Sequence, residues 1–294
     1  MNITEKTLKE LFGLDFQPFS VSALGMAGTK SNGGVITLLT EERFASEIND
    51  NNDVKVVLMN EKLADYVRSD VVKLYVDDPK WYFFSLLNHL AKNREREKTK
   101  IASSAVIHPS AVISDVGVLI GEGVVVEPNV TIYPDVIVEN DVLIRAGAVL
   151  GVDGFEHKKT ARGIVSVIHD GCLIVKEKSE IGPNNTVIKG FSYRDTVVGR
   201  ETKLDALVHY AHGVQSGERC FIAAQAMIAG HVTIGDDVWI GPSVSVSNRL
   251  NIGADAFLTI GSVVVKDVPA GRKVTGNFAI PHDRFIQNLK ASIK

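Results

Sequence analysis

The sequence predicts a β-dominated chain made of a small N-terminal α/β domain, a triangular parallel β-helix and a short C-terminal helix. Two observations lead to this class. An aliphatic residue recurs at every sixth position from residue 120 onward, whereas residues 1–92 lack that period and alternate between strand-like and helix-like segments. A period of six residues fits neither the 3.6-residue turn of a helix nor the two-residue alternation of a strand. It fits a solenoid in which each flat side is six residues long.

The six-residue period places one inward side chain on each side of a triangular coil. Three sides then make a coil of about 18 residues, and successive coils stack at the strand spacing of about 4.8 Å. Hexapeptide β-helices are left-handed as a class, although parallel crossovers are otherwise right-handed, so the handedness is expected from the class and not from the pattern. In the second part of the run only Tyr210 and Ser216 are not aliphatic. The residues of the run are Ile120, Val126, Ile132, Val138, Ile144 and Leu150, then Val198, Leu204, Tyr210, Ser216, Ile222, Ile228, Ile234, Ile240, Val246, Ile252, Leu258 and Val264.

The repeat is interrupted twice. Residues 151–174, GVDGFEHKKTARGIVSVIHDGCLI, collect glycine, charged and polar residues, and residues 189–195, KGFSYRD, form a second irregular stretch. We expect both to be loops that leave the rigid solenoid, and such loops commonly carry binding residues.

Three domains are expected. Residues 1–97 form the α/β domain, 98–276 the β-helix and 277–294 a terminal helix that begins at a proline. The elements expected in the first domain are a helix (TEKTLKELFGL), a strand (VITLL), a helical turn (EERFASEI), two strands (VKVVLM and VVKLYV) and a helix (WYFFSLLNHLAK).

Composition excludes several classes of function. The net charge of −3 gives no electrostatic reason to expect nucleic acid or an anionic membrane as partner. The two cysteines, Cys172 and Cys220, do not make a disulfide scaffold or a structural zinc motif. With no signal peptide and no stretch long enough to span a membrane, the expected compartment is the cytoplasm.

The stretch LVHYAHGV contains the strongest candidate for chemistry. Gly230 follows His212 by 18 residues, the length of one coil, so the two residues are expected to stack side by side at one corner. The imidazole can take a proton from a nucleophile, and the glycine N–H can hold the oxyanion of a tetrahedral intermediate. Asp205, at the preceding corner, is expected to fix the tautomer of His212.

Simpler interpretations of the same residues stay open. A histidine at a solenoid corner is often structural, an aspartate after an inward aliphatic residue belongs to the repeat itself, and Gly230 also suits a plain turn. His209, three residues before His212, is expected to be a wall of the site or a bystander.

Longer segments resemble a known family. LGVDGFEHK, KLDALVHYAHGV and FIAAQAMIAGHVTIG resemble the UDP-3-O-acylglucosamine N-acyltransferases of lipid A assembly. ALGMAGTKSNGGVITLLTEERF, VKVVLM and VKLYVDDPKWYF resemble the uridine-binding domain of that family. The resemblance follows nearly the whole chain in order, and the combination of two domains is more specific than the repeat, which many acyltransferases share.

The resemblance implies a homotrimer with active sites between neighbouring β-helices. It implies acyl transfer from a thioester, on acyl carrier protein or coenzyme A, to the amine of a nucleotide-linked amino sugar, with no permanently bound cofactor and no metal. By position, the general base of the family falls on His212, its orienting aspartate on Asp205 and its oxyanion glycine on Gly230.

The chain also departs from that family. An aromatic residue, an asparagine and a second aromatic residue of the uridine-binding segment are replaced by Leu38, Glu41 and Phe44, so only Phe44 remains to stack on a base. A second family histidine is Arg249 here, and the acidic–basic pair before the base is replaced by Ile188 and Lys189. The C-terminal extension that engages acyl carrier protein in the family is much shorter.

Five further residues are candidates for substrate binding. Lys189, Arg194 and Arg249 suit a phosphate or diphosphate, although each is equally suited to a solvated surface. Phe155 and His157 are expected either to line a sugar or acyl pocket or to pack within their own loop.

Three other functions compete with the lipid A reaction. The nearest is N-acylation or N-acetylation of a nucleotide-linked deoxy-amino sugar for a surface polysaccharide, with acyl-CoA as donor. A zinc β-helix carbonic anhydrase would need His209, His212 and His231 to converge on one site. A catalytically idle scaffold would have no reason to keep Asp205, His212 and Gly230 together.

Overall fold

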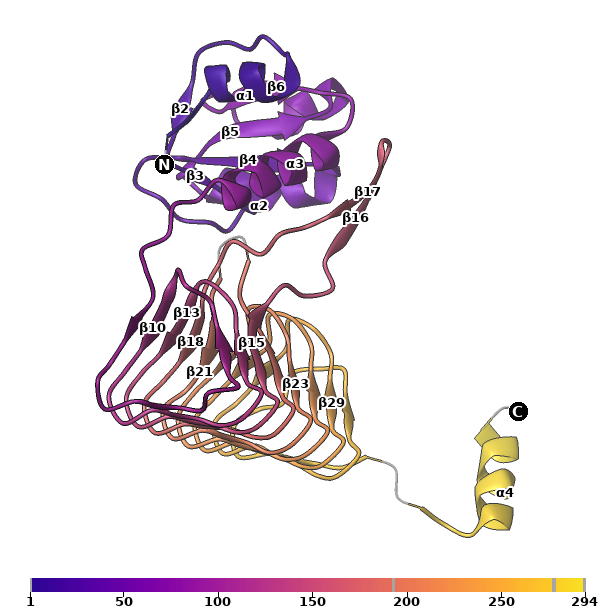
Figure 1. Ribbon diagram of the computed structural model, residues 1–294. Coiled ribbons are helices and arrows are strands. Elements are labelled where there is room, and N and C mark those ends of the chain that lie inside the picture. Colours follow the sequence, from indigo (N-terminus) through magenta and orange to yellow (C-terminus); the bar gives the residue numbers. More distant parts are fainter. Residues whose placement is uncertain (1, 192–193, 277–278, 293–294) are drawn as a thin grey trace.

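The computed structural model describes residues 2–191, 194–276 and 279–292. Figure 1 shows an α/β unit above one edge of a three-sided prism of stacked coils, with a helix beyond the last coil. The predicted fold class, a left-handed parallel β-helix with a small α/β domain and a short terminal helix, is confirmed.

Each side of the prism is one parallel sheet, whose strands come from successive coils. The first sheet contains β7 (Lys100–Ile101), β10 (Val118–Ile120), β13 (Val136–Val138), β18 (Leu173–Val175), β21 (Thr196–Val198), β24 (Gln215–Ser216), β27 (Thr233–Ile234) and β30 (Asn251–Ile252). The second contains β8 (Val106–Ile107), β11 (Val125–Val126), β14 (Leu143–Ile144), β19 (Glu180–Ile181), β22 (Lys203–Leu204), β25 (Phe221–Ile222), β28 (Trp239–Ile240), β31 (Phe257–Leu258) and β33 (Lys273–Val274). The third contains β9 (Val112–Ile113), β12 (Thr131–Ile132), β15 (Val149–Val152), β20 (Thr186–Ile188), β23 (His209–Tyr210), β26 (Met227–Ile228), β29 (Ser245–Val246) and β32 (Val263–Val264).

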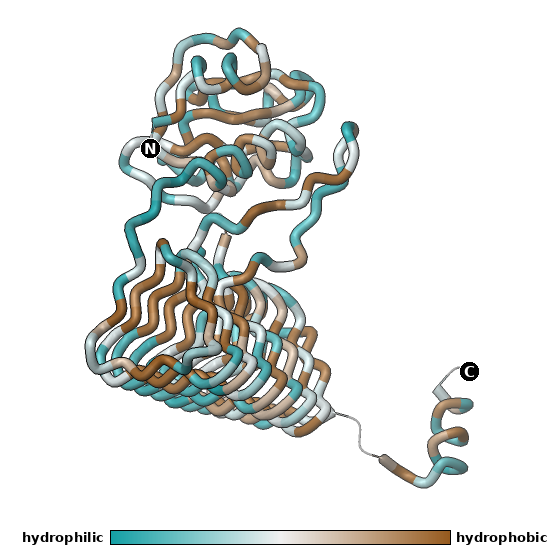
Figure 2. Tube along the Cα trace, in the orientation of Figure 1, coloured by the Kyte–Doolittle hydropathy of each residue, from teal (hydrophilic) through white to brown (hydrophobic). Residues whose placement is uncertain are grey.

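The inward side chains form one continuous core. Leu204 pairs with Ile222 and Ile222 with Ile240, so equivalent residues of successive coils are 18 positions apart. Every residue of the predicted six-residue run is buried, including Tyr210 and Ser216. Burial of each aliphatic side chain contributes about 1.5–3 kcal/mol, which is why the sequence repeats the residue type at this position. Figure 2 shows the hydrophobic positions in register from coil to coil.

The corners between the sheets impose their own conformation. A residue with positive φ recurs every six positions, at Glu201, Leu207, Gly213, Arg219 and Gln225, and the series continues through His231 and Arg249. The left-handed region disfavours side chains by roughly 1–2 kcal/mol per residue, so coil closure, and not residue preference, sets these corners. His231 and Arg249 are therefore held at fixed points of the prism.

Both predicted interruptions leave the prism where the sequence placed them. Val136 pairs with Leu173, which adds a long insert to one coil, and the insert forms an antiparallel hairpin of β16 (His157–Thr160) and β17 (Gly163–Ser166). Leu173 pairs with Thr196, which leaves a shorter insert in the next coil. Both inserts start at the edge of the prism that faces the α/β unit (Figure 1).

The α/β unit is built on a parallel sheet in the order β3-β4-β5-β6. Its strands are β3 (Ala23–Leu24), β4 (Val35–Leu39), β5 (Val54–Met59) and β6 (Val72–Tyr75), and β1 (Ile3–Thr4) pairs with β2 (Ser20–Val21). Its helices are α1 (Glu5–Phe12), α2 (Ala45–Asp50) and α3 (Pro79–Lys92), with 3-10 turns η1 (Glu42–Phe44) and η2 (Glu61–Tyr66).

The α/β unit is attached to the β-helix through the two inserts. Val167 and Phe191, one from each insert, are buried in the same hydrophobic cluster as the residues of α3. The Asn88 amide donates to the Ser166 carbonyl at 2.8 Å and accepts from the Ile168 N–H at 2.8 Å. These contacts fix the unit over one edge of the prism and close a cavity there.

The chain continues past the last coil into α4 (His282–Ser292). Figure 1 shows this helix apart from the prism, and Phe285 and Leu289 are exposed on it. The predicted terminal segment 277–294 includes positions 277–278 and 293–294, which lie outside the described residues. Among the described helices, none has the length and apolar character needed to cross a bilayer.

Candidate active site

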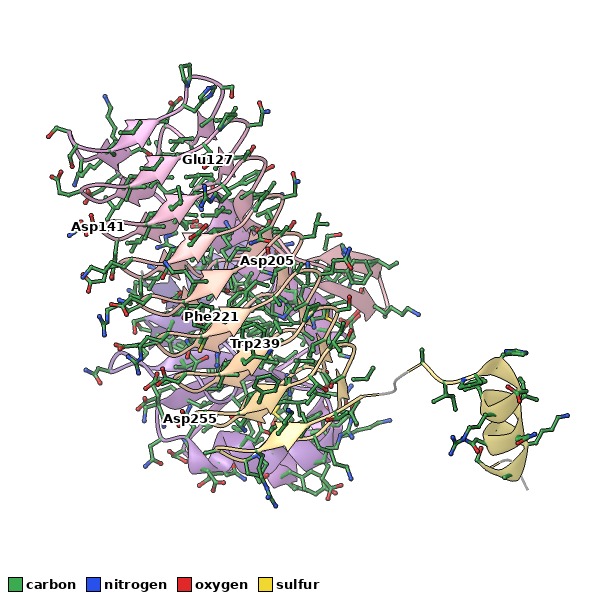
Figure 3. The ribbon with its side chains drawn as sticks, turned by 90° about the horizontal axis from the view of Figure 1, so that it is seen from below. Glu127, Asp141, Asp205, Phe221, Trp239 and Asp255 are labelled. Carbon is green, nitrogen blue, oxygen red and sulfur yellow. The ribbon has the colours of Figure 1, made fainter. Side chains whose placement is uncertain are left out.

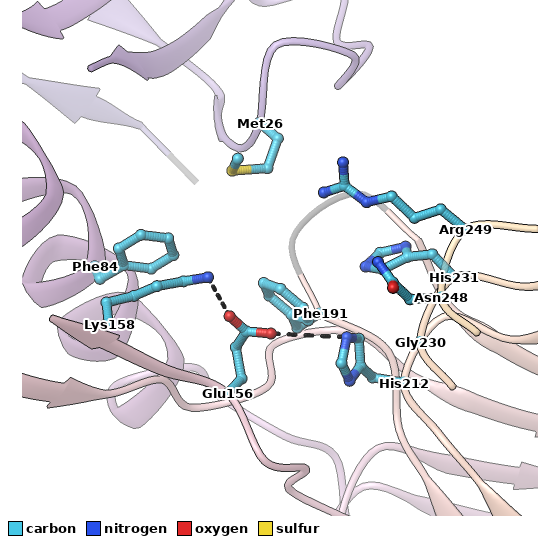
Figure 4. Close-up of a pocket in the computed structure, with 10 residues that line it drawn as sticks. All are labelled: Met26, Phe84, Glu156, Lys158, Phe191, His212, Gly230, His231, Asn248 and Arg249. Atoms are coloured by element: carbon cyan, nitrogen blue, oxygen red, sulfur yellow. Dashed lines mark ion pairs between the residues drawn. The ribbon is translucent and has the colours of Figure 1, made fainter. Parts of the chain in front are cut away.

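A cavity of about 270 Å³ lies where the α/β unit, the hairpin insert and one corner of the prism meet (Figure 4). The α/β unit contributes Met26 and Phe84 to its wall, and the two inserts contribute Glu156, Lys158 and Phe191. The corners of three successive coils supply the remaining lining residues, which are His212, Gly230, His231, Asn248 and Arg249.

His212 and Gly230 are neighbours in this cavity, as the 18-residue coil predicts. A Cβ atom at position 230 would lie 2.5 Å from Nε2 of His212 and 2.8 Å from its Cε1. No side chain fits there without moving the ring, so only glycine allows the imidazole to lie against the backbone of the next coil.

One backbone donor at this corner has no acceptor among the described residues. The N–H of His231 donates to the carbonyl of His212 at 2.9 Å, and the carbonyl of Gly230 accepts from the N–H of Arg249 at 2.9 Å. The N–H of Gly230 donates to no acceptor among residues 2–191, 194–276 and 279–292. A peptide N–H beside an imidazole is the pair of groups needed to bind an oxyanion and move a proton.

Glu156 is the carboxylate that lies against the imidazole. Its Oε2 is 3.7 Å from Nε2 of His212, and its Oε1 forms an ion pair with Nζ of Lys158. That ammonium also lies 5.1 Å from the centre of the Phe84 ring. The hairpin insert thus places a carboxylate, supported by a lysine, at the nitrogen of His212 that faces Gly230 (Figure 4).

Burial keeps the histidines of this region neutral. It lowers the pKa of His212 below the usual value of 6.5, and Glu156 opposes part of that shift. Burial, followed by the charge of His212, lowers the pKa of both His169 and His231 to about 4. His212 is therefore in the base form at neutral pH.

Three imidazoles surround one phenylalanine ring in the wall of the site. The ring centroid of Phe191 lies 5.0 Å from that of His169, 5.1 Å from that of His212 and 5.8 Å from that of His231. His169 is fully buried, and its Nε2 accepts from the N–H of Gly154 at 3.3 Å. His169 thus ties the base of the hairpin insert to the corner that carries His212.

Within one chain, Asp205 does not contact His212. Asp205 follows β22, at the opposite end of β23 from His212, and its carboxylate accepts from the N–H of Ala206 at 2.7 Å and of Ala224 at 3.2 Å. Figure 3 shows it beside Phe221 and Trp239, on the side of the prism turned away from the α/β unit. Asp205 thus caps the turn of its own corner, as expected for an aspartate that follows an inward aliphatic residue and belongs to the repeat.

Two of the three predicted phosphate-binding cations are used inside the protein. Lys189 is buried, with its Nζ 3.5 Å from Asp135 and 3.6 Å from Asp153. Arg194 donates from Nε to the carbonyl of Gly213 at 2.6 Å and from its guanidinium to Oγ1 of Thr233 at 2.9 Å. Both cations connect the second insert to neighbouring coils and do not line the cavity, whereas Arg249 does line it.

Phe155, His157 and His209 also lie outside the cavity lining. Phe155 is 90% exposed, and its ring packs on that of His157 at 4.8 Å. The Nδ1 of His157 lies 3.0 Å from the Ser166 hydroxyl across the hairpin. Within one chain, Phe155 and His157 thus contact their own loop. His209 points outward from β23.

The three residues expected to contact a nucleotide base lie at or just after the end of β4 and do not line the cavity. Leu38 is partly buried in the core of the α/β unit. Glu41 is exposed and pairs with Arg43 at 3.0 Å, and the Arg43 guanidinium lies 4.7 Å from the centre of the Phe44 ring. One face of the remaining aromatic ring is thus covered by an arginine of the same turn.

The described part of the chain contains no group of three or more His, Cys, Asp or Glu residues arranged to hold a metal ion. His212 and His231 lie in the cavity wall with ring centroids 5.1 Å apart, but His209 is on the outer surface of the sheet. The three histidines that a carbonic anhydrase site would need do not converge within one chain.

The sequence patterns do not point to six of the lining residues, which are Met26, Phe84, Glu156, Lys158, Phe191 and Asn248. The pattern of the insert GVDGFEH favours Phe155 and His157, whereas the cavity is lined by Glu156 between them. Alternate residues of an extended segment point to opposite sides, so the side chains on either side of Glu156 face away when Glu156 faces the cavity. That alternation was the available signal, but the direction of the insert was unknown.

The resemblance stated from the sequence is confirmed over about half of the chain. Residues 117–151 match the family model of the bacterial transferase hexapeptide, six repeats. The chain is 39% identical over 146 residues to the UDP-3-O-acylglucosamine N-acyltransferase of Methylobacterium sp. (strain 4-46), a match that covers 50% of this chain and 41% of the relative. It is 32% identical over 152 residues to the enzyme of that name from Wolinella succinogenes, covering 51% of this chain and 47% of the relative.

The matched segments thus span less than half the length of these curated relatives. Among solved structures, the UDP-N-acetylglucosamine acyltransferase from Campylobacter jejuni is similar, with a TM-score of 0.50 and 19% identity over 66% of this chain and 83% of that chain. At this identity the likeness shows the β-helix fold alone.

Proposed function

We propose that the protein is an N-acyltransferase that moves an acyl group from a thioester to the amine of a nucleotide-linked amino sugar. The similarity to UDP-3-O-acylglucosamine N-acyltransferases supports the reaction class. The observation that carries the proposal is the contact of neutral His212 with Gly230 inside one cavity.

In this reaction the acceptor amine attacks the thioester carbonyl carbon while Nε2 of His212 takes one of its protons. The N–H of Gly230 donates to the oxygen that becomes negative in the tetrahedral intermediate. The C–S bond then breaks, the new C–N bond remains as an amide, and the imidazolium returns its proton to the leaving thiolate. Arg249, at the cavity wall, binds the phosphates of the nucleotide.

The finer assignments rest on the resemblance. We propose acyl carrier protein or coenzyme A as the carrier of the acyl group and a homotrimer as the assembly, with no permanently bound cofactor. In a trimer, the cavity at the prism corner would be bounded by a neighbouring subunit as well as by the hairpin.

The test is release of free thiol by the purified protein with two donors and two acceptors. The donors are acetyl-CoA and a 3-hydroxyacyl carrier protein, and the acceptors are a UDP-3-O-acylglucosamine and a dTDP-linked amino-deoxy sugar. Turnover that needs an amine acceptor and is lost in a His212→Ala variant supports the proposal. Turnover that persists in that variant, or no turnover with any pair, contradicts it.

One observation favours the second candidate, transfer from acyl-CoA to a nucleotide-linked deoxy-amino sugar. Of the two aromatic positions in the uridine-binding segment, only Phe44 is aromatic here, and Arg43 covers one face of its ring. The asparagine of that segment is replaced by Glu41, which pairs with Arg43. A changed base-binding segment is expected where the nucleotide has changed. Turnover with coenzyme A and the dTDP sugar alone would select this candidate.

A further inference from the structure

Glu156 stands at the point where the acceptor must bind. Its side chain and that of His212 are about equally shielded, 16% and 15% exposed, and the cavity is their shared opening. The carboxylate is carried by the hairpin insert, whereas the imidazole belongs to the prism. Their contact therefore depends on how the insert folds back over the corner.

The geometry allows Glu156 and His212 to share the acceptor atom. Proton transfer requires the acceptor nitrogen to lie about 3 Å from Nε2 of His212. Because Oε2 of Glu156 is only 3.7 Å from that same Nε2, one acceptor atom placed between them can hydrogen-bond to both groups. Gly230 borders Nε2 from the prism side, and Glu156 borders it from the insert, so an acceptor at Nε2 can lie beside the carboxylate.

The two oxygens of Glu156 have different partners. Oε1 pairs with Lys158, whose ammonium is held over the Phe84 ring. Oε2 is directed to His212 (Figure 4). The lysine holds the carboxylate in place through one oxygen and leaves the other in front of the imidazole.

We infer that Glu156 recognises the amine of the acceptor and selects it over a hydroxyl, an inference that rests on the proposed function. An amine brings at least two N–H groups, so one proton can pass to His212 while another donates to Oε2 of Glu156. A hydroxyl has one proton and cannot satisfy both groups, and its oxygen would face a carboxylate as it loses that proton. Glu156 itself gains and loses no proton in the reaction.

The experiment compares Glu156→Gln with wild type for an amino acceptor and for the matched nucleotide sugar with a hydroxyl in place of the amine. Loss of a charge-assisted hydrogen bond should raise the KM for the amino acceptor roughly 10- to 100-fold. We expect kcat to stay within about threefold and the KM of the thioester donor within about twofold. Binding of the hydroxyl analogue should be unchanged or tighter.

Glu139→Gln is the matched control. Glu139 forms a 2.7 Å ion pair with Lys176 at another corner of the prism and lies outside the cavity, so its loss should leave every KM unchanged. Thermal unfolding of both variants checks that the fold is kept.

Different failures separate the two proposals. No transfer by the wild-type protein to any amine would overturn the proposed function. Transfer by wild type together with an unchanged amine-to-hydroxyl preference in Glu156→Gln would overturn this inference alone. A variant whose kcat falls equally for every acceptor, with a lower acid limb of the pH profile, would show that Glu156 acts only through His212 and would also overturn it.

Discussion

The two ends of strand β23 each present a carboxylate, and the two differ in what they contact. Asp205, before the strand, binds backbone N–H groups of its own corner and of the next coil. Glu156, beyond the strand, comes from an insert and lies against His212. The repeat therefore supplies carboxylates for structure at its regular corners, and the carboxylate of the candidate site enters from a segment that breaks the repeat.

Of the variants that test this comparison, His212→Ala is expected to change kcat the most. Removal of a general base should lower kcat about 10²- to 10⁴-fold, because Glu156 holds the amine by a hydrogen bond and does not replace the imidazole as base. His209→Ala, on the outer surface of the same strand, is the control and should stay near wild type. Steady-state thiol release measures both, and equal losses would show that the cavity is not the site.

Gly230→Ala tests whether the stacking of neighbouring coils positions the base. The added Cβ would lie 2.5 Å from Nε2, so the ring must move by an ångström or more. A displacement of that size should lower kcat by roughly 10²-fold while the fold remains. Gly28→Ala, where nothing lies within 4 Å of the new atom, is the control. Wild-type turnover in Gly230→Ala would contradict the assigned contact.

The pH dependence of kcat follows from burial of the base. Because the pKa of His212 lies below 6.5, the imidazole stays deprotonated at pH values where an exposed histidine is already charged. Activity should therefore hold through pH 6.5 and fall, about tenfold per unit, only once the pH drops below the lowered pKa. A pH–rate profile with its acid limb above 6.5 would be inconsistent with a buried neutral base.

Stability should respond to acid through His169. Its pKa is about 4 in the fold and near 6.5 when unfolded, so the unfolded state binds more protons between these values. The free energy of unfolding should then decrease as the pH falls from 6.5 to 4, by up to about 1.4 kcal/mol per unit from this residue. Chemical denaturation at several pH values measures the slope, and His169→Gln should make it shallower; an equal slope in the variant would refute the assignment.

The smallest effect is expected from Asp205→Ala. Loss of a side chain that caps backbone N–H groups should lower the free energy of unfolding by about 1 kcal/mol, with kcat within about threefold of wild type. Urea denaturation and the thiol assay measure the two quantities. A kcat loss as large as that of His212→Ala would mean that Asp205 serves an imidazole across a subunit boundary.

Much of the architecture was available from the sequence because it depends on short-range repetition. One aliphatic residue in six determines which side chain points inward, and the count of 18 places His212 beside Gly230, since stacked coils keep their register. The six-residue repeat also located both inserts, because the repeat stops where each insert begins. The path of the inserted chain in space is not needed to see this.

Only the tertiary structure decided which carboxylate meets the imidazole. The spacing from Asp205 to His212 is that of adjacent corners, and adjacent corners of a triangular coil are separated by the length of a strand. Glu156 reaches His212 because the hairpin insert folds back against α3 and the corner, through contacts between segments far apart in the sequence. The repeat determines the prism. The candidate site depends on packing between the prism, the two inserts and the α/β unit, and no local sequence pattern encodes that packing.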